Sequence, residues 1–127
     1  DKSIKVNYDF DKAPFVKFTA TYLDSILLNL VTNSIKYKSL KRTLKIDISS
    51  FQTKEGVTLM YKDNGIGIDV DLHKDKLFKL YQRFHDNPDG KGLGLYLIKS
   101  QIEALGGSIN IESDLDKGTT FIMKFKN

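Results

Sequence analysis

The sequence predicts a single α/β domain built in two layers: a mixed, mostly antiparallel sheet of about five to six strands, with about three helices on one face. Short runs in which apolar and polar residues alternate, as they do in half-buried strands, recur along the chain. Longer segments place apolar residues at helical spacing instead. No repeat, low-complexity tract or linker interrupts this pattern. Residues 1–127 are therefore expected to form one domain.

The first part of the chain predicts a hairpin followed by a long helix. Residues 3–10 and 14–20 alternate around a turn at 11–14, which is typical of two paired strands. The helix that follows begins near Thr19 or Thr21, either of which can cap it, and runs to about Tyr37. Its apolar stripe, which we expect to face the core, consists of Leu23, Ile26, Leu27, Leu30, Val31 and Ile35.

The rest of the chain predicts two further hairpins, a second long helix and a loop. Alternating runs on either side of 53–56 give the second hairpin, and runs on either side of 114–118 give the last one. Residues 93–105 have helical spacing and end at the glycine pair 106–107. Residues 70–89 hold one short amphipathic piece and a turn-rich end, so they predict a partly ordered, mobile loop.

Composition excludes several classes of function. The 127 residues are 40% hydrophobic, which suffices for one buried core. The absence of cysteine excludes disulfides, thiolate metal sites and cysteine nucleophiles, and it is compatible with a reducing cytoplasm. No apolar stretch has the length of a membrane span, and the first residues lack the layout of a secretory signal.

Basic residues give the chain a formal net charge of +4. Part of the excess gathers in a basic cluster formed by Lys36, Lys38, Lys41, Arg42 and Lys45. Such a cluster is typical either of a solvated face or of a surface that binds a polyanion such as nucleic acid, lipid or a nucleotide. The sequence leaves both interpretations open.

The first long helix carries polar groups on one face, beside its apolar stripe. Asn29, Asn33 and Tyr37 follow one another at intervals of four, and Lys36 lies three residues after Asn33. Two carboxamides, an ammonium group and a phenol would therefore line the rim of a cavity above the sheet. The plainer interpretation is that these asparagines are exposed polar residues.

A glycine-rich turn follows the predicted strand that ends at Asp63. Gly65 and Gly67 can take backbone angles that other residues avoid, so the backbone there can approach a planar ring closely. A buried carboxylate at Asp63 would accept a hydrogen bond from the exocyclic amine of a base. The alternative is an ordinary strand-ending turn, for which Asp-Asn-Gly is a common signal.

A second glycine-rich stretch, Gly90, Gly92 and Gly94, directly precedes the second long helix. Glycines beside a free helix N-terminus present backbone amides to an anion, which suits phosphate groups. Leu95 and Tyr96 stand where a P-loop would carry Lys followed by Ser or Thr. Leu95 also occupies the third glycine position of the dinucleotide fingerprint. Both of these better-known nucleotide folds are disfavoured.

The order and spacing of these motifs resemble those of the histidine-kinase ATPase family, which includes the Hsp90 chaperones, type II topoisomerases and MutL-type repair proteins. The resemblance spans nearly the whole chain and implies the two-layer Bergerat ATP-binding fold, with a long lid over the nucleotide. The motifs that carry it are residues 29–37, 63–67, Leu77-Phe78 with Tyr81 and Arg83, residues 90–95, and residues 118–121.

The resemblance implies a role for each matching residue. Asn33 would supply an oxygen to Mg²⁺, which usually keeps waters and takes its other ligands from phosphates. Asn29 would contact the phosphate region, and Lys36 would neutralise phosphate charge. Tyr37 would pack near the adenine of ATP. Asp63 would read that base, in a pocket shaped by Gly65 and Gly67.

The remaining implied contacts with ATP come from the second half of the chain. Arg83 would reach the γ-phosphate from the lid. Gly90, Gly92, Leu93, Gly94 and Leu95 would let the lid and the start of the helix close on the phosphates. Thr119 or Thr120 would close the adenine side.

Residue 29 distinguishes sensor histidine kinases from other members of this family. The chaperones, topoisomerases, repair ATPases and serine-directed anti-sigma kinases carry a glutamate four residues before the magnesium asparagine, where it acts as general base. An amide such as Asn29 cannot take up a proton at neutral pH. The resemblance therefore implies the catalytic domain of a sensor histidine kinase, which donates the γ-phosphate of Mg-ATP. A stand-alone ATPase of the same family is one alternative, and a nucleic-acid-binding module that uses the basic cluster is another, although no nucleic acid is expected.

The histidine that accepts the phosphate is expected to lie outside this chain. His73 and His85 fall in the predicted loop and lack the helical setting of the acceptor motif. The implied partners are the dimerisation and phosphoacceptor domain of the same kinase and, indirectly, a response-regulator receiver domain. We expect a cytoplasmic domain that is monomeric in isolation and does not autophosphorylate alone. The full-length protein is expected to be a homodimer, and a membrane-bound sensor is compatible with this.

Overall fold

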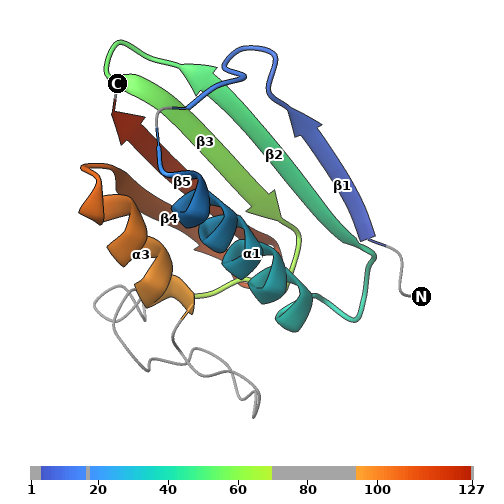
Figure 1. Ribbon diagram of the computed structural model, residues 1–127. Helices are drawn as coiled ribbons and strands as arrows, with labels where there is room; N and C mark the ends of the chain where they lie inside the picture. Colours follow the sequence, from blue (N-terminus) through green and yellow to red (C-terminus); the bar gives the residue numbers. More distant parts are fainter. Residues whose placement is uncertain (1–3, 17, 70–93, 127) are drawn as a thin grey trace.

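The computed structural model describes residues 4–16, 18–69 and 94–126, which form the two layers that the sequence predicts (Figure 1). Within these residues, one layer is a five-stranded sheet, and the other consists of two helices that lie on the same face of it (Figure 1). The strands are β1 (Ile4–Asp9), β2 (Leu44–Gln52), β3 (Gly56–Asp63), β4 (Ser108–Asp114) and β5 (Gly118–Lys126); the helices are α1 (Ala20–Lys36) and α3 (Gly94–Ala104). The sequence predicts about three helices. The short amphipathic piece predicted in residues 70–89 lies outside the described residues.

The sheet is mixed and mostly antiparallel, as predicted. Its order is β1-β2-β3-β5-β4. The pairs β2–β3, β3–β5 and β4–β5 are antiparallel, so the second and the last predicted hairpins are confirmed. Strand β3 lies in the centre between β2 and β5, and its pairing with β5 brings the end of β3 next to the start of β5.

The first predicted hairpin is wrong. Strand β1 forms, but it pairs in parallel with β2, with Ile4 opposite Leu44 and Asp9 opposite Ser49. Alternation identifies a half-buried strand without naming its partner, and a parallel partner requires a long crossover, which α1 supplies. Residues 14–16 and 18–19 form no strand. Phe18 instead packs edge-on against Phe125, with ring centroids 4.8 Å apart.

Helix α1 begins at Ala20, after Thr19 in the N-cap position, and ends at Lys36 with Tyr37 as its C-cap. The hydroxyl of Thr19 makes no capping hydrogen bond. Ile26 and Leu30 are buried as predicted, but Ile35 is 43% exposed and does not face the core. Ser34, four residues after Leu30, occupies the inward position instead.

The hydrophobic core fills the space between the sheet and the two helices. Its buried members are Ile26, Leu30, Leu44, Ile46, Leu59, Tyr61, Ile98, Ile102, Ile109, Phe121, Met123 and Phe125.

Helix α3 ends before Gly106, as the glycine pair predicts, and Gly106 has a φ of 85°, which most side chains disfavour. Neither helix of the described part has the length and apolarity to cross a bilayer. The packing fixes the C-terminal end of α1 over the end of β3 (Figure 1).

Candidate functional site

Asp63, the last residue of β3, is a buried carboxylate. Only 8% of its surface is exposed, although it has no cationic partner among the described residues. Its Oδ2 accepts a hydrogen bond from Ser34 Oγ at 2.7 Å, and its Oδ1 accepts one from the backbone amide of Gly65 at 3.0 Å. Hydrogen bonds of this kind satisfy a buried carboxylate. Each oxygen has capacity for a further donor, so this group can bind a ligand amine.

Tyr61 lies two residues before Asp63 on the same face of β3, and its ring is buried in the core. Its hydroxyl is 2.9 Å from Ser34 Oγ. Burial raises the pKa of Tyr61 to about 12; the negative charge of Asp63 adds to this effect, and the hydrogen bond with Ser34 opposes it. Tyr61 therefore stays protonated and able to donate at neutral pH.

Glycines allow three chain segments to meet beside Asp63. A Cβ at Gly65 would lie 2.6 Å from the carbonyl oxygen of Tyr37, at the end of α1. Gly67 has a φ of 74°, and a Cβ there would collide with the carbonyl oxygen of Asp114. A Cβ at Gly118 would collide with the carbonyl oxygen of Asp63. The turn after β3 therefore packs closely against the end of α1 on one side and the β4–β5 turn on the other.

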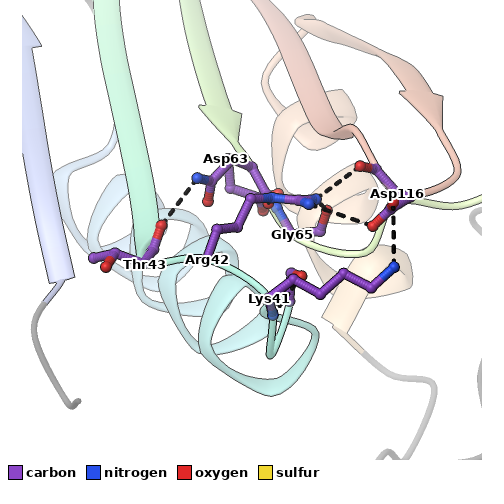
Figure 2. Close-up of polar contacts among 8 residues, drawn as sticks. Lys41, Arg42, Thr43, Asp63, Gly65 and Asp116 are labelled. Carbon is purple, nitrogen blue, oxygen red and sulfur yellow. Dashed lines mark hydrogen bonds and ion pairs between the residues drawn. The ribbon is translucent and has the colours of Figure 1, made fainter.

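Arg42 joins these segments with its guanidinium group, which Figure 2 shows between Gly65 and Asp116. Its Nε donates to the carbonyl oxygen of Asn64 at 2.8 Å, and its Nη2 donates to those of Gly65 at 2.9 Å and Asp116 at 2.8 Å. Its Nη1 also lies 3.3 Å from Asp116 Oδ1. Arg42 therefore fits neither a solvated face nor a polyanion-binding surface, the two interpretations of the basic cluster, because it binds backbone carbonyls of its own chain.

The neighbours of Arg42 complete this connection. Lys41 Nζ lies 3.7 Å from Asp116 Oδ2, but the lysine side chain is 77% exposed, so this ion pair contributes little. Asn64 accepts from the backbone amide of Lys45 at 2.8 Å and donates to the carbonyl oxygen of Thr43 at 3.0 Å. The segment after α1 is therefore bonded along its length to the turn after β3.

Thr119 and Ser113 close the opposite side of the turn. Thr119 is buried opposite Asp63 in the β3–β5 pair, and its Oγ1 lies 2.8 Å from Ser113 Oγ. Ser113 accepts from the backbone amide of Ile68 and donates to the carbonyl oxygen of Gly118, both at 2.8 Å. Thr120 is half-buried beside Lys62, one position further along the pair.

The polar face of α1 lies where the sequence predicts it, beside the buried stripe. Asn29, Asn33 and Tyr37 are half-buried and Lys36 is exposed. Within the described part of the chain, neither carboxamide side chain of Asn29 or Asn33 is used in a hydrogen bond. The carbonyl oxygen of Tyr37 accepts from the backbone amide of Ile66 at 2.9 Å. The end of α1 is thus attached directly to the glycine turn.

The structure brings predicted residues of three motifs together. The α1 face that ends at Tyr37 meets the turn that holds Asp63, Gly65 and Gly67, and Thr119 lies on the other side of that turn. Gly94 is the first residue of α3, and Leu95 packs against the core. The remaining predicted site residues, Arg83, Gly90, Gly92 and Leu93, lie outside the described residues, as do His73 and His85.

The sequence reasoning missed Ser34, Tyr61, Arg42 and Ser113. For the first two, a signal was present. Ser34 falls four residues after Leu30 and eight after Ile26, so helical spacing places it on the buried face. Tyr61 and Asp63 share the face of β3 that also carries Leu59. A polar residue in such a stripe indicates a buried hydrogen bond. Nothing in the sequence indicates the partners of Arg42 and Ser113, which lie far away along the chain.

Comparison with known proteins identifies the family. The model of the histidine kinase-, DNA gyrase B-, and HSP90-like ATPases matches residues 19–127. The chain is 36% identical over 117 residues to cyanobacterial phytochrome A of Nostoc sp., and 29% identical over 129 residues to the histidine protein kinase SaeS of Staphylococcus epidermidis. These alignments cover 91% and 99% of this chain, but only 15% and 36% of the relatives.

A solved structure shows the same fold. The nucleotide-free catalytic domain of histidine kinase ThkA matches with a TM-score of 0.79 and 26% sequence identity, over 97% of this chain and 80% of that one. The chain belongs to the histidine kinase-, DNA gyrase B-, and HSP90-like ATPase family. The resemblance seen in the motifs is confirmed, and ATP is the nucleotide expected of a domain in an ATPase family.

Proposed function

We propose that this chain is the ATP-binding catalytic domain of a sensor histidine kinase, which holds Mg-ATP and presents its γ-phosphate to a histidine on a separate domain. The observation that carries the proposal is the buried Asp63 carboxylate, which retains acceptor capacity beside a half-buried asparagine face of α1. Membership of the ATPase family and similarity to proteins named as histidine kinases support it.

Asp63 is the proposed reader of the base. An ionised carboxylate can only accept hydrogen bonds, and the exocyclic amine of adenine donates them. The tight approach of Gly65 to the end of α1 leaves backbone rather than side chain beside this carboxylate. Tyr37, half-buried at the C-cap of α1, and Thr119 and Thr120 at the start of β5 flank the turn on its two sides. A planar base is therefore the ligand that this end of the sheet suits.

Asn33 is the proposed protein ligand of Mg²⁺. The side-chain oxygen of Asn33 accepts no hydrogen bond within the described residues. Asn33 lies on α1, the helix whose Ser34 donates a hydrogen bond to Asp63. The described residues contain no group of three or more acidic, histidine or cysteine side chains that could hold a metal. A single amide oxygen fits Mg²⁺, which takes its remaining ligands from water and nucleotide phosphates. When bound, the metal would neutralise charge on those phosphates, together with Lys36.

Asn29 favours a kinase over a stand-alone ATPase. It stands one helical turn before Asn33, on the same face, and cannot take a proton from water. In the proposed transfer, the imidazole of the outside histidine attacks the γ-phosphorus, the bond to the bridging oxygen breaks and ADP leaves. This chain positions the nucleotide and neutralises its charge, and the acceptor domain supplies the nucleophile.

Calorimetric titration with a non-hydrolysable ATP analogue, with and without Mg²⁺, tests the proposal. Asp63→Asn is expected to weaken binding about 10- to 100-fold, the usual range for loss of a hydrogen bond to a charged group. Asn33→Ala is expected to remove the dependence of binding on Mg²⁺. The matched controls are Asp47→Asn and Asn110→Ala, which change the same side chains at exposed positions in β2 and β4.

The outcomes separate the alternatives. Absence of binding by the wild-type chain, or unchanged Mg-dependent binding by both site variants, would contradict the proposal. Hydrolysis of ATP by the isolated chain at ordinary enzyme rates, roughly 1 per second or more, would favour a stand-alone ATPase instead. Salt-sensitive binding to nucleic acid without nucleotide binding would favour the module based on the basic cluster.

A further inference from the structure

Three buried groups, Tyr61, Ser34 and Asp63, form a continuous chain of hydrogen bonds from the core to the proposed base-reading carboxylate. Tyr61 has 0% of its surface exposed and Ser34 has 1%. The two contacts measure 2.9 Å between the hydroxyl oxygens and 2.7 Å from Ser34 Oγ to Asp63 Oδ2. They join residues 27 and 29 positions apart in the sequence, so tertiary packing alone creates this chain.

The direction of this hydrogen-bond chain follows from the number of hydrogens. Ser34 has one hydroxyl hydrogen, and it is donated to Asp63 Oδ2. The hydrogen between Tyr61 and Ser34 must therefore come from the phenol, which is protonated at neutral pH because burial raises its pKa to about 12. The two hydrogen bonds therefore run in one direction, from Tyr61 to Ser34 and from Ser34 to Asp63. If the serine hydroxyl turned to donate to Tyr61 instead, Asp63 Oδ2 would lose this donor.

We propose that Tyr61 and Ser34 are positioning residues that give the site its preference for a 6-aminopurine over a 6-oxopurine. The inference rests on the proposed function of Asp63 and adds what sets its selectivity. Ser34 and the amide of Gly65 each occupy one oxygen, so the carboxylate is fixed in rotation and can only accept. The 6-amino group of adenine donates to such a group, whereas the 6-oxo group of hypoxanthine presents a second acceptor and is repelled.

Loss of the serine hydroxyl removes one of the two protein hydrogen bonds that hold the carboxylate. The side chain then becomes free to turn toward the N1 hydrogen of a 6-oxopurine. This freedom lowers selectivity for the base, whereas contacts with sugar and phosphates stay the same. Loss of the Tyr61 hydroxyl acts only through the serine and has a smaller effect.

The test is calorimetric titration of the 127-residue chain with ADP and with IDP, which differ at position 6 of the base and in the hydrogen that the 6-oxopurine carries at N1. The ratio of the two dissociation constants is the readout, because losses in sugar and phosphate binding cancel in it. Ser34→Ala is expected to lower the wild-type preference for ADP on the order of tenfold, and Tyr61→Phe about threefold. The double variant is expected to resemble Ser34→Ala, because the phenol acts through the serine.

Two control variants separate positioning from general loosening of the fold. Ser50→Ala removes another buried serine hydroxyl, which donates to the carbonyl oxygen of Ala13 at 2.7 Å. Tyr8→Phe removes an exposed phenol from β1. Both controls are expected to keep the wild-type ratio, whatever they do to thermal stability.

The inference is overturned if Tyr61→Phe and Ser34→Ala both keep the wild-type ratio. If Ser34→Ala does not fold, a wild-type ratio in Tyr61→Phe overturns it alone. Equal affinity of the wild-type chain for ADP and IDP would refute this selectivity while leaving nucleotide binding intact. Failure to bind either nucleotide would refute the proposed function and this inference together.

Discussion

The two ends of the sheet are built in different ways. At the end that holds Asp63, several side-chain hydrogen bonds join residues far apart in the sequence, such as Arg42 and Asp116, 74 positions apart. At the opposite end, the β2–β3 turn is held by local contacts. Gln52 Nε2 donates to the carbonyl oxygens of Thr53 and Gly56, no more than four positions away.

This difference shows which contacts depend on the whole fold for their stability. Local turn contacts form as soon as the hairpin forms. The contacts at the Asp63 end require α1, the turn after β3 and the β4–β5 turn to be in place together, and they include buried polar groups that are costly when unpaired. The proposed binding end should therefore be the more cooperative and the more sensitive to single substitutions. Three predictions, ordered by the size of the expected effect, test this contrast.

The largest difference is expected between two glycines with positive φ. Gly67→Ala forces a Cβ into the carbonyl oxygen of Asp114 at a φ of 74°, and should lower the free energy of unfolding by about 3–5 kcal/mol. Gly106→Ala, at a φ of 85°, meets nothing closer than the flexible Lys126 side chain at 4.0 Å, and should cost only about 1 kcal/mol. Urea unfolding followed by circular dichroism measures both, and equal losses would contradict the contrast.

A smaller difference is expected between Arg42 and Gln52, each of which binds carbonyl oxygens of a turn. Arg42→Ala removes donors from three backbone carbonyls, two of them in partly buried hydrogen bonds, and should cost about 2–3 kcal/mol. Gln52→Ala, at the exposed opposite turn, should cost about 0.5 kcal/mol. Lys41→Ala controls for charge and should cost less than about 0.5 kcal/mol. Urea midpoints check all three, and a loss in Lys41→Ala comparable to that in Arg42→Ala would show that charge rather than the carbonyl contacts matters.

The smallest effect is expected from alkaline pH, through Tyr61. Its pKa is raised to about 12 in the folded chain, so the stability it contributes is complete below its ordinary value near 10 and is lost as pH rises from about 10 to 12. The wild-type chain should lose on the order of 1–2 kcal/mol more than Tyr61→Phe over this range, after allowance for solvent screening.

Urea unfolding of both chains at pH 8 and pH 11.5 measures this difference, because the other tyrosines and the lysines titrate in both. The absorbance of tyrosinate should show a late-ionising tyrosine in the wild-type chain that is missing from the Tyr61→Phe variant. Parallel loss of stability in the two chains would contradict the assignment to Tyr61.

Much of the fold follows from patterns in the sequence. Alternation located four of the five strands in two correct hairpins, because both hairpins have short turns and adjacent partners. Helical spacing and the glycine pair at 106–107 located both described helices. The glycine turn after β3 also gave Asp63 as a candidate carboxylate, although an ordinary strand-ending turn stayed open, and the structure shows that Asp63 is buried.

The failures have a common physical cause. The first hairpin was wrong because the partner of β1 is 40 residues away, from Ile4 to Leu44, and alternation says nothing about distant pairing. Ile35 was assigned to the core because it fits the helical period, yet the sheet lies under the positions of Leu30 and Ser34. Which residues of a stripe are buried depends on the surface that covers them.

The sequence by itself determined the kind of domain, the order of its elements and the residues proposed to bind ATP and magnesium, since these depend on local periodicity and on motif spacing. The tertiary structure alone decided that Ser34 and Tyr61 hold Asp63, and that Arg42 is a bridge between turns rather than a surface cation. A hydrogen bond requires two groups to meet within about 3 Å. For groups tens of residues apart, only the packing of helix on sheet brings them that close.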